Sequence, residues 1–94
     1  DSINGNNGKD ILVGGKGADW MKGENGEDHL IGNEDADTLD GGNDNDILKG
    51  GDAADTLRGG NGKDILVGNA GMDSAIGGPN IDTCDAESET NCEI

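Results

Sequence analysis

Apolar residues recur along this chain at every ninth position, and the positions between them are mostly polar. Leu30, Leu39 and Leu48 mark three successive periods. Aliphatic residues flank this position in short stretches such as Ile-Leu-Val at 65–67, in which one side chain points inward and its two neighbours point outward. The pattern therefore predicts a strand of three residues in every nine, separated by six residues of turn.

Glycine and aspartate keep the same spacing. Nine copies of a nonapeptide run from residue 5 to residue 85 without an insertion or deletion, and each has Gly at its first position and Asp at its sixth. A continuous helix is excluded, because each interior glycine would cost about 1 kcal/mol. We expect instead an all-β solenoid whose eighth-position side chains form a thin interior ladder. The expected ladder residues are Ile3, Leu12, Met21, Leu30, Leu39, Leu48, Leu57, Leu66, Ala75 and Cys84.

The composition raises the question of what holds such a solenoid together. The 94 residues include 19 Gly and one aromatic residue, and the formal net charge is −15. Low hydrophobicity with high net charge usually gives a disordered chain, so we expect something other than an apolar core to stabilise the fold. The acidity argues against a nucleic-acid partner, because no basic patch is present to neutralise phosphates. No apolar run is long enough to span a membrane.

The nonapeptide resembles a known repeat. GGNGKDILV at 59–67 matches G-G-x-G-x-D-x-U-x, the calcium-binding nonapeptide of RTX or hemolysin-type proteins, at every specified position. The resemblance covers residues 1–85, with 1–4 as a truncated repeat. It implies a right-handed parallel β-roll in which two nonapeptides make one turn and calcium lies between turns stacked on the same edge. It also implies that each sixth-position Asp is shared between adjacent ions, and that carbonyl oxygens of the first four positions complete the shell, the first and third from one turn and the second and fourth from its neighbour.

The chemistry of the repeat suits calcium independently of the resemblance. Calcium takes six to eight oxygen ligands in a tolerant geometry, and glycine turns leave carbonyl groups free to face it. The expected carboxylate ligands are Asp10, Asp28, Asp46, Asp64 and Asp82 on one edge and Asp1, Asp19, Asp37, Asp55 and Asp73 on the other. The first-position carbonyl ligands that the resemblance implies are those of Gly5, Gly14, Gly23, Gly32, Gly41, Gly50, Gly59, Gly68 and Gly77. Five turns on each edge leave four gaps, so we expect at most about eight Ca²⁺ ions, with a weak site or none beside Asp1.

Two other interpretations of the carboxylates explain less. A solvated acidic surface would not place Asp at every ninth residue. An EF-hand needs spaced acidic ligands, a central Gly and a closing Glu, and no stretch of the chain supplies them together. Calcium turns therefore remain the better explanation.

One copy departs from the motif in its turn. The fourth position of the other copies holds Gly, Asn or Asp, which tolerate positive φ. The copy at 50–58 has alanines in this part of the turn, and we expect strain at Ala54. Calcium bound to that turn is expected to be held more weakly.

The outward positions fall on two faces of the expected roll. One face is mostly polar, and the other carries the aliphatic residues Ile11, Val13, Ile31, Ile47, Ile65 and Val67. β-Branched residues favour strands, and this preference alone is one explanation. The other is a docking face for a partner domain or another copy, because contiguous exposed apolar patches rarely lack a role. Ile11, Ile31, Ile47 and Ile65 are spaced by 18 or 20 residues and are expected to form one column.

The nonapeptides stop at residue 85, and residues 86–94 form a tail that we expect to cap the roll. Cys84 occupies an inward ladder position, and Cys92 lies in the tail. A disulfide between them would indicate an oxidising, extracellular setting. Two buried free thiols are the alternative.

No catalytic constellation is present. The sequence has no Cys/His or Ser/His arrangement with a third orienting group, no phosphate-binding G-x-x-x-x-G-K-[ST] loop, and one histidine, His29, expected on a strand surface rather than on a metal. We expect a non-enzymatic, calcium-binding, stabilising module of a secreted or surface bacterial protein, which folds when Ca²⁺ binds. The alternative is a spacer or filament-forming cell-surface subunit that assembles through its aliphatic face.

Overall fold

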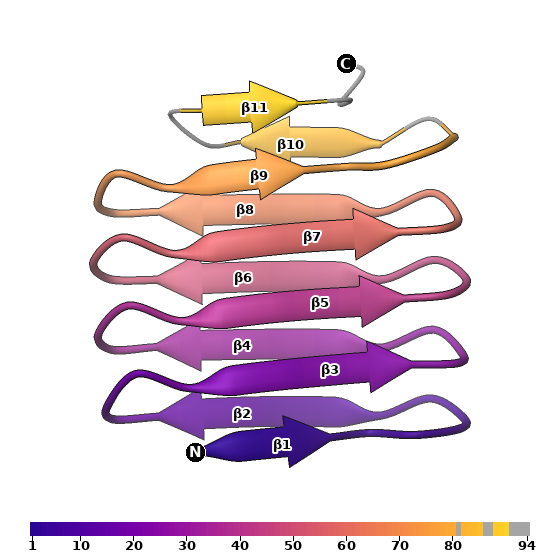
Figure 1. Ribbon diagram of the computed structural model, residues 1–94, viewed down its shortest axis with the longest axis horizontal. Coiled ribbons are helices and arrows are strands. Elements are labelled where there is room, and N and C mark those ends of the chain that lie inside the picture. Colours follow the sequence, from indigo (N-terminus) through magenta and orange to yellow (C-terminus); the bar gives the residue numbers. More distant parts are fainter. Residues whose placement is uncertain (81, 86–87, 91–94) are drawn as a thin grey trace.

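All regular secondary structure in the described part of the chain is β-strand. The computed structural model describes residues 1–80, 82–85 and 88–90. The strands are β1 (Ser2–Asn4), β2 (Ile11–Gly15), β3 (Trp20–Glu24), β4 (His29–Asn33), β5 (Thr38–Gly42), β6 (Ile47–Gly51), β7 (Thr56–Gly60), β8 (Ile65–Asn69), β9 (Ser74–Ile76), β10 (Thr83–Asp85) and β11 (Ser88–Thr90). They stack into a flat roll of 30 × 28 × 12 Å, with β1 at one end and β11 at the other (Figure 1).

Two parallel sheets form the two layers of the roll. One has the strand order β1-β3-β5-β7-β9-β11 and the other β10-β8-β6-β4-β2, so the chain crosses from one layer to the other after every strand (Figure 1). Within the nonapeptides each strand pairs with the strand 18 residues further on, as Leu30 does with Leu12 and with Leu48. Two nonapeptides therefore make one turn, and the predicted parallel β-roll is confirmed.

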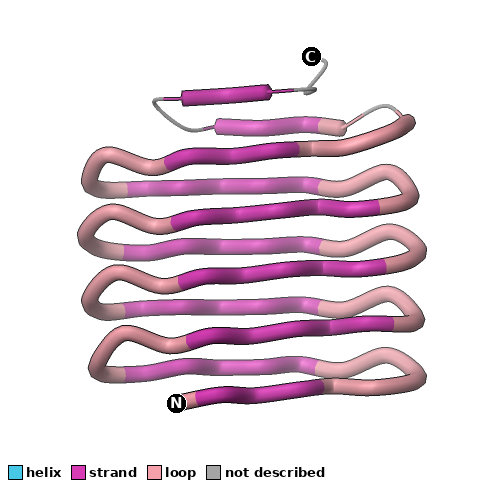
Figure 2. The backbone as a smooth tube through the Cα atoms, in the orientation of Figure 1, coloured by secondary structure: helices cyan, strands magenta, loops and turns pink. Residues whose placement is uncertain are grey.

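The strands are longer than the sequence pattern predicts. Each of β2 to β8 has five residues, which are positions seven to nine of one copy and positions one and two of the next (Figure 2). Only four residues are left for each turn between these strands, so the prediction of three strand and six turn residues was wrong for β2 to β8. It is right for the strand lengths of β1, β9 and β10, which have three residues each. Pairing continues past the first-position glycine because second-position residues stay in register, as in Gly15 with Asn33 and Glu24 with Gly42.

Each repeat contributes one side chain to a thin interior, and the predicted ladder is confirmed. Seven of its residues, from Met21 to Ala75, have no exposed surface, and Leu12 and Cys84 are 5% exposed. Ile3, on the end strand β1, is partly buried and packs against this core. Burial of one leucine contributes only about 2 kcal/mol. With one such residue in nine, much of the stabilisation has to come from the turns.

The second and fourth positions of the copies take left-handed backbone conformations. Glycine occupies many of these positions, and Asn or Asp most of the others, as in Asn33 with φ 83° and Asp44 with φ 74°. In the copy at 50–58 the fourth residue is Ala53, which has φ 79°. The expected strain at Ala54 was therefore misplaced by one residue, because Ala54 is the fifth residue of its copy and follows the left-handed position.

Replacing Ala53 by glycine is expected to stabilise the roll. A left-handed conformation costs an L-residue about 1–2 kcal/mol, and glycine avoids this cost, so we expect the free energy of unfolding to rise by about 1 kcal/mol. Urea denaturation in calcium measures it. Ala54→Gly is the matched control and should be neutral or destabilising. An equal gain from both substitutions would contradict the assignment of the strain.

The outer face of the five-stranded sheet carries two columns of side chains rather than one. The first is Ile11, His29, Ile47, Ile65 and Thr83, and the second contains Val13, Ile31, Lys49 and Val67. The prediction that Ile31 shares a column with Ile11, Ile47 and Ile65 was wrong. Ile31 is a ninth-position residue and the other three are seventh-position residues, so their columns lie two residues apart along the strands.

The aliphatic side chains of this face are open to solvent to different degrees. Ile11, Val13 and Ile65 are 76%, 50% and 44% exposed, and Ile31 is partly buried. On the opposite sheet Trp20 is 59% exposed, beside the smaller polar side chains of its own column. The aliphatic face expected from the sequence is therefore present, although a lysine and a histidine interrupt it.

The C-terminal strands continue the roll in two ways. β10 keeps the spacing of 18 residues from β8, whereas β11 pairs with β9 at a spacing of 14, as in Ser88 with Ser74. The tail thus adds a last strand to the six-stranded sheet without being a nonapeptide. Cys84 is buried at the end of the interior ladder. Its expected partner Cys92 lies outside the described residues, so the disulfide stays a prediction.

Candidate metal centre

The sixth-position aspartates form two columns, one along each row of turns. Each lies directly before a strand, so the 18-residue register places it beside the Asp of the next turn on the same edge. Those at most 3% exposed are Asp19, Asp28, Asp37, Asp46, Asp55, Asp64, Asp73 and Asp82. Asp10 is partly buried, and Asp1 is exposed at the end of the stack. The structure thus gathers the predicted carboxylates into two buried rows.

One oxygen of each buried carboxylate holds two turns together. Oδ1 of Asp46 accepts a hydrogen bond of 2.8 Å from the backbone N–H of Asp28, one turn earlier, and Oδ1 of Asp64 accepts one of 2.8 Å from Asp46. The same bond recurs along both columns. At the first turn the amino group of Asp1 takes the place of the amide and forms an ion pair with Asp19. The aspartates therefore stack the turns even before any ion is considered.

The second oxygen points to the first glycine of its own copy. A Cβ built on Gly41 would lie 2.5 Å from Oδ2 of Asp46 and 2.8 Å from the carbonyl oxygen of Gly59, one turn further on. The carboxylate oxygen and the carbonyl oxygen thus face one small cradle that a side chain would fill. Among the described residues, the buried Oδ2 atoms without a hydrogen-bond partner include those of Asp10, Asp19, Asp28, Asp37, Asp46, Asp55, Asp64 and Asp82. Buried polar atoms are normally paired, so this row calls for a ligand.

Burial raises the pKa of five carboxyl groups inside the two columns. Desolvation raises the pKa of Asp46 from 3.8 to about 7, opposed by the hydrogen bond from Asp28 and reinforced by the charge of Asp64. Desolvation likewise raises the pKa of Asp55 and of Asp64 to about 6. The pKa values of Asp28 and Asp37 are raised for the same reason. Without a cation, the interior of each column therefore disfavours its own negative charge.

The donor set fits a hard cation that binds oxygen. In the described residues, no three His, Cys, Asp or Glu side chains are grouped so that they could hold a metal ion, so carbonyl oxygens would have to complete any shell. The first-position carbonyl of Gly59 faces the same cradle as Asp46 Oδ2. The second-position carbonyl of Glu24 already accepts a 2.7 Å hydrogen bond from Asn43 N–H, which leaves it one lone pair. Sharing of each carboxylate between two ions stays a prediction.

Comparison with known families shows which repeat this is. A family model described as the RTX calcium-binding nonapeptide repeat matches four times, at residues 1–21, 13–48, 40–75 and 49–84. The chain belongs to this RTX repeat family. Its buried Asp columns are therefore part of a calcium-binding repeat module. No curated protein and no solved structure matches the chain.

The two edges of the RTX roll differ at the third position of the turns. On one edge this position holds Asn7, Asn25, Asn43 and Asn61, whose side-chain amides bond to one another with N–O distances of 2.9, 2.7 and 2.9 Å. We call these four residues the asparagine ladder. The sequence analysis missed it, although Asn at the third position of every second copy, before Pro79 ends the series, was the available signal.

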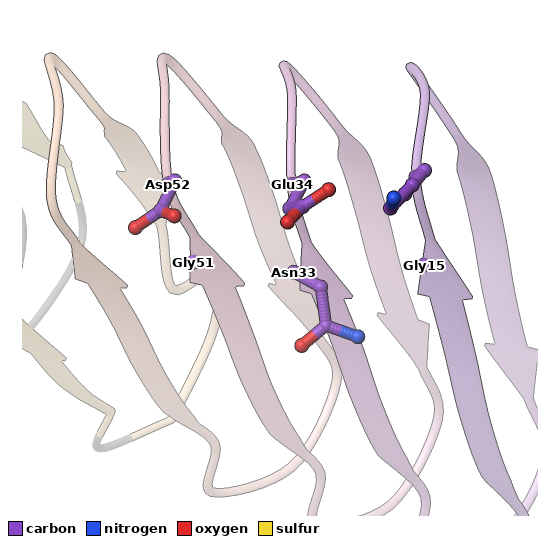
Figure 3. A pocket seen from close by; sticks show the side chains of 6 residues that line it. Gly15, Asn33, Glu34, Gly51 and Asp52 are labelled. Atoms are coloured by element: carbon purple, nitrogen blue, oxygen red, sulfur yellow. The ribbon is translucent and has the colours of Figure 1, made fainter.

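The third position of the opposite RTX edge carries charged residues in three successive turns and Ala70 in the next. Lys16, Glu34 and Asp52 come from successive turns, are exposed, and line an open pocket with Gly15, Asn33 and Gly51. Figure 3 shows the carboxylates of Glu34 and Asp52 on neighbouring turns. These groups lie in solvent, outside the buried Asp column of that edge. They add to the negative charge of the edge but leave the buried oxygens unpaired.

His29 lies on the outer face of β4, at the strand position that the sequence predicted. Its neighbours in the column are Ile11 and Ile47. Its Nε2 atom is buried and has no hydrogen-bond partner among the described residues.

No helix in the described part of the RTX roll is long and apolar enough to cross a membrane.

Proposed function

We propose that this RTX module is a calcium-dependent folding unit. It is largely disordered where calcium is scarce and folds into the roll where calcium is abundant. The observation that carries the proposal is the row of buried carboxylate oxygens without partners. A buried carboxylate that lacks a counter-charge costs several kcal/mol, and here the cost is repeated along both edges. Binding of cations to the folded state alone would offset this cost and couple binding to folding.

The residues that would hold calcium are the sixth-position aspartates together with backbone carbonyls of the turns. Calcium, when bound, supplies the positive charge that the columns lack. The chain's own contribution is to hold Asp46 Oδ2 and the carbonyl of Gly59 around one cradle, and to keep that cradle free of side-chain atoms by placing glycine at position 41. The hydrogen bond from Asp28 N–H to Asp46 Oδ1 fixes the carboxylate in this orientation.

We further propose that the module belongs to a secreted or surface-attached bacterial protein and is not itself an enzyme. Extracellular fluids hold the calcium concentrations at which such weak modules fill, about 10⁻⁴–10⁻³ M. A disulfide between Cys84 and Cys92 would agree with this location. The calcium-binding role requires no reaction, and the side chains gathered in the turns are carboxylates suited to a cation.

Circular dichroism of the full chain tests the folding proposal. In EDTA we expect the spectrum of a largely disordered chain, and in calcium of about 1 mM a cooperative gain of β-sheet. Magnesium at the same concentration is the control, and it should substitute poorly because it requires a tight octahedral shell and dehydrates reluctantly. The same sheet content in EDTA and in calcium would refute the proposal.

The aliphatic face supports a second candidate function, a spacer or filament subunit that associates through this face. The supporting observation is that Ile11, Val13 and Ile65 remain 44–76% exposed on one sheet of a strongly acidic chain. Association should require calcium, because the columns exist only in the folded roll. Replacing Ile47 and Ile65 by threonine should keep the circular dichroism spectrum and weaken association measured by sedimentation. A calcium-loaded wild type that stays monomeric at high concentration would exclude self-assembly.

A further inference from the structure

The asparagine ladder is built largely from Asn-Gly dipeptides. Asn7, Asn25 and Asn61 are each followed by glycine, and the chain's fourth Asn-Gly pair, at residues 4–5, lies outside the ladder. In such a dipeptide the backbone nitrogen of glycine can reach the preceding side-chain amide with little hindrance, because glycine has no Cβ. The sequence thus puts a chemically labile bond into three turns of one edge.

We propose that the ladder asparagines, and Asn25 above all, are sites of spontaneous deamidation that stacking of the turns protects. In the reaction the backbone nitrogen of Gly26 attacks Cγ of Asn25 and forms a succinimide. The bond from Cγ to Nδ2 breaks, and ammonia leaves with the proton that the Gly26 nitrogen loses. Water then opens the ring at either carbonyl and gives aspartate or isoaspartate. Solvent water is the one co-reactant.

The hydrogen bonds around Asn25 oppose this attack in the folded roll. Its Nδ2 donates to Oδ1 of Asn7 at 2.9 Å, and its Oδ1 accepts from Nδ2 of Asn43 at 2.7 Å. The attacking nitrogen is also engaged, because Gly26 N–H donates to Oδ2 of Asp44 at 3.1 Å. The side chain has to leave its rotamer, and three bonds have to open, before Cγ meets the Gly26 nitrogen.

Asn4 provides an internal comparison. It is exposed on the end strand β1, where its Oδ1 accepts a 3.1 Å hydrogen bond from the N–H of Asn6. The attacking nitrogen is engaged here as well, because Gly5 N–H donates a 2.8 Å hydrogen bond to the carbonyl oxygen of Lys22. Among the described residues, the side chain of Asn4 forms no hydrogen bond to another turn, whereas that of Asn25 is bonded to a turn on either side. Deamidation at Asn4 should therefore respond less to folding than deamidation at Asn25.

Deamidation would change the turn in a way that calcium cannot repair. An aspartate at position 25 has no amide donor for Asn7, and an isoaspartate also adds one carbon to the backbone of a four-residue turn. The shifted register would separate Gly26 from the turn it stacks on. Chains that wait in the unfolded state therefore lose the ability to complete this edge. This consequence rests on the proposed calcium-dependent folding, whereas the protection itself rests on the stacked turns.

The test compares deamidation rates in the full chain kept in calcium or in EDTA at neutral pH, by peptide mapping with mass spectrometry. In EDTA we expect the four Asn-Gly pairs to react at similar rates. In calcium we expect Asn25 to react at least about tenfold more slowly than in EDTA, and more slowly than Asn4. Equal rates at Asn25 and Asn4 in a sample whose circular dichroism shows the sheet would overturn the inference. A sheet in both buffers would instead contradict the proposed function, and Asn25 would then have to be protected in both.

A substitution outside the reacting dipeptide isolates the ladder. Asn43→Ser removes the donor to Asn25 and leaves residues 23–27 unchanged, so we expect the rate at Asn25 to rise about fivefold in calcium and to stay constant in EDTA. Asn45→Ser is the matched control, because Asn45 bonds to the N–H of Lys63 and is not part of the ladder. An unchanged rate at Asn25 in folded Asn43→Ser would overturn the protective role of the ladder.

Discussion

Asp46→Asn is expected to act in opposite directions with and without calcium. In calcium the variant should bind fewer ions and lose about 2 kcal/mol of unfolding free energy, because a charge-assisted partner of the cation is gone. In EDTA it should be more folded than the wild type, since the amide keeps an oxygen for Asp28 N–H and removes a buried charge with no partner. Urea denaturation in calcium, circular dichroism in EDTA and calorimetric calcium titration of the metal-free, chelator-free protein measure these effects.

The control for this substitution is Asp40→Asn. Asp40 faces outward from β5, next to Lys22 and Arg58 in its column, so its loss should change stability by less than about 0.5 kcal/mol in either buffer. A loss of stability by Asp46→Asn of equal size in calcium and in EDTA would contradict the role of the carboxylate as a cation ligand.

Lowering the pH tests the cost of the buried Asp46 charge without a substitution. The pKa of Asp46 is about 7 in the roll and 3.8 for the unperturbed group, so the folded state binds its proton more tightly. In EDTA the stability of the roll should therefore be highest below about pH 4 and be lost as the pH rises toward 7. At about pH 5 the wild type should approach the Asp46→Asn variant, because its carboxyl group is then protonated when folded. Calcium should bind more weakly at this pH.

Gly41→Ala is expected to prevent both local stacking and binding. Gly41 does not have a left-handed conformation, but its Cβ would lie 2.5 Å from Asp46 Oδ2 and 2.8 Å from the carbonyl oxygen of Gly59. Overpacking of this kind costs about 3 kcal/mol, and the methyl group would occupy the cradle itself. We expect a lower melting temperature in calcium and the loss of at least one bound ion by calorimetry.

Gly17→Ala separates lack of space from backbone strain. Gly17 has φ 94°, yet a Cβ there would meet nothing within 4 Å, so the cost should be the 1–2 kcal/mol of the left-handed conformation, with calcium stoichiometry unchanged. If Gly41→Ala kept the wild-type calcium stoichiometry and cost no more than Gly17→Ala, the first-position glycines would not serve the cradle.

The interior could be predicted from the sequence because one rule determines it. Every ninth side chain points inward, and Leu12 to Cys84 are buried as expected. The strand boundaries could not be predicted in this way, because two successive glycines are typical of a turn. In the structure, backbone pairing with the neighbouring turn extends β5 through Gly41 and Gly42. Local propensity is weaker here than a register that repeats without interruption.

The candidate site was only partly predictable for a similar reason. The period of nine identifies Asp46 and its equivalents as a set, but it does not predict the orientation of each carboxylate. The two oxygens of Asp46 differ, because Oδ1 accepts a hydrogen bond from Asp28 N–H and Oδ2 has no partner. This difference depends on a contact between residues 18 positions apart in the sequence. The asparagine ladder also has this longer period, so it is visible only when alternate copies are compared.

The coexistence of the two periods limits how the array can change in length. The interior repeats every nine residues, whereas the edges and outer faces repeat every 18. Deleting two successive nonapeptides would join equivalent positions and preserve every stack. Deleting one would leave the leucine interior intact but send all later strands to the opposite sheet, so that aliphatic columns would continue as polar ones and asparagines would meet charged residues. Insertion or deletion of two nonapeptides at a time would therefore preserve the fold and its surfaces. Insertion or deletion of a single nonapeptide would preserve the interior but place unlike residues next to one another on the edges and outer faces.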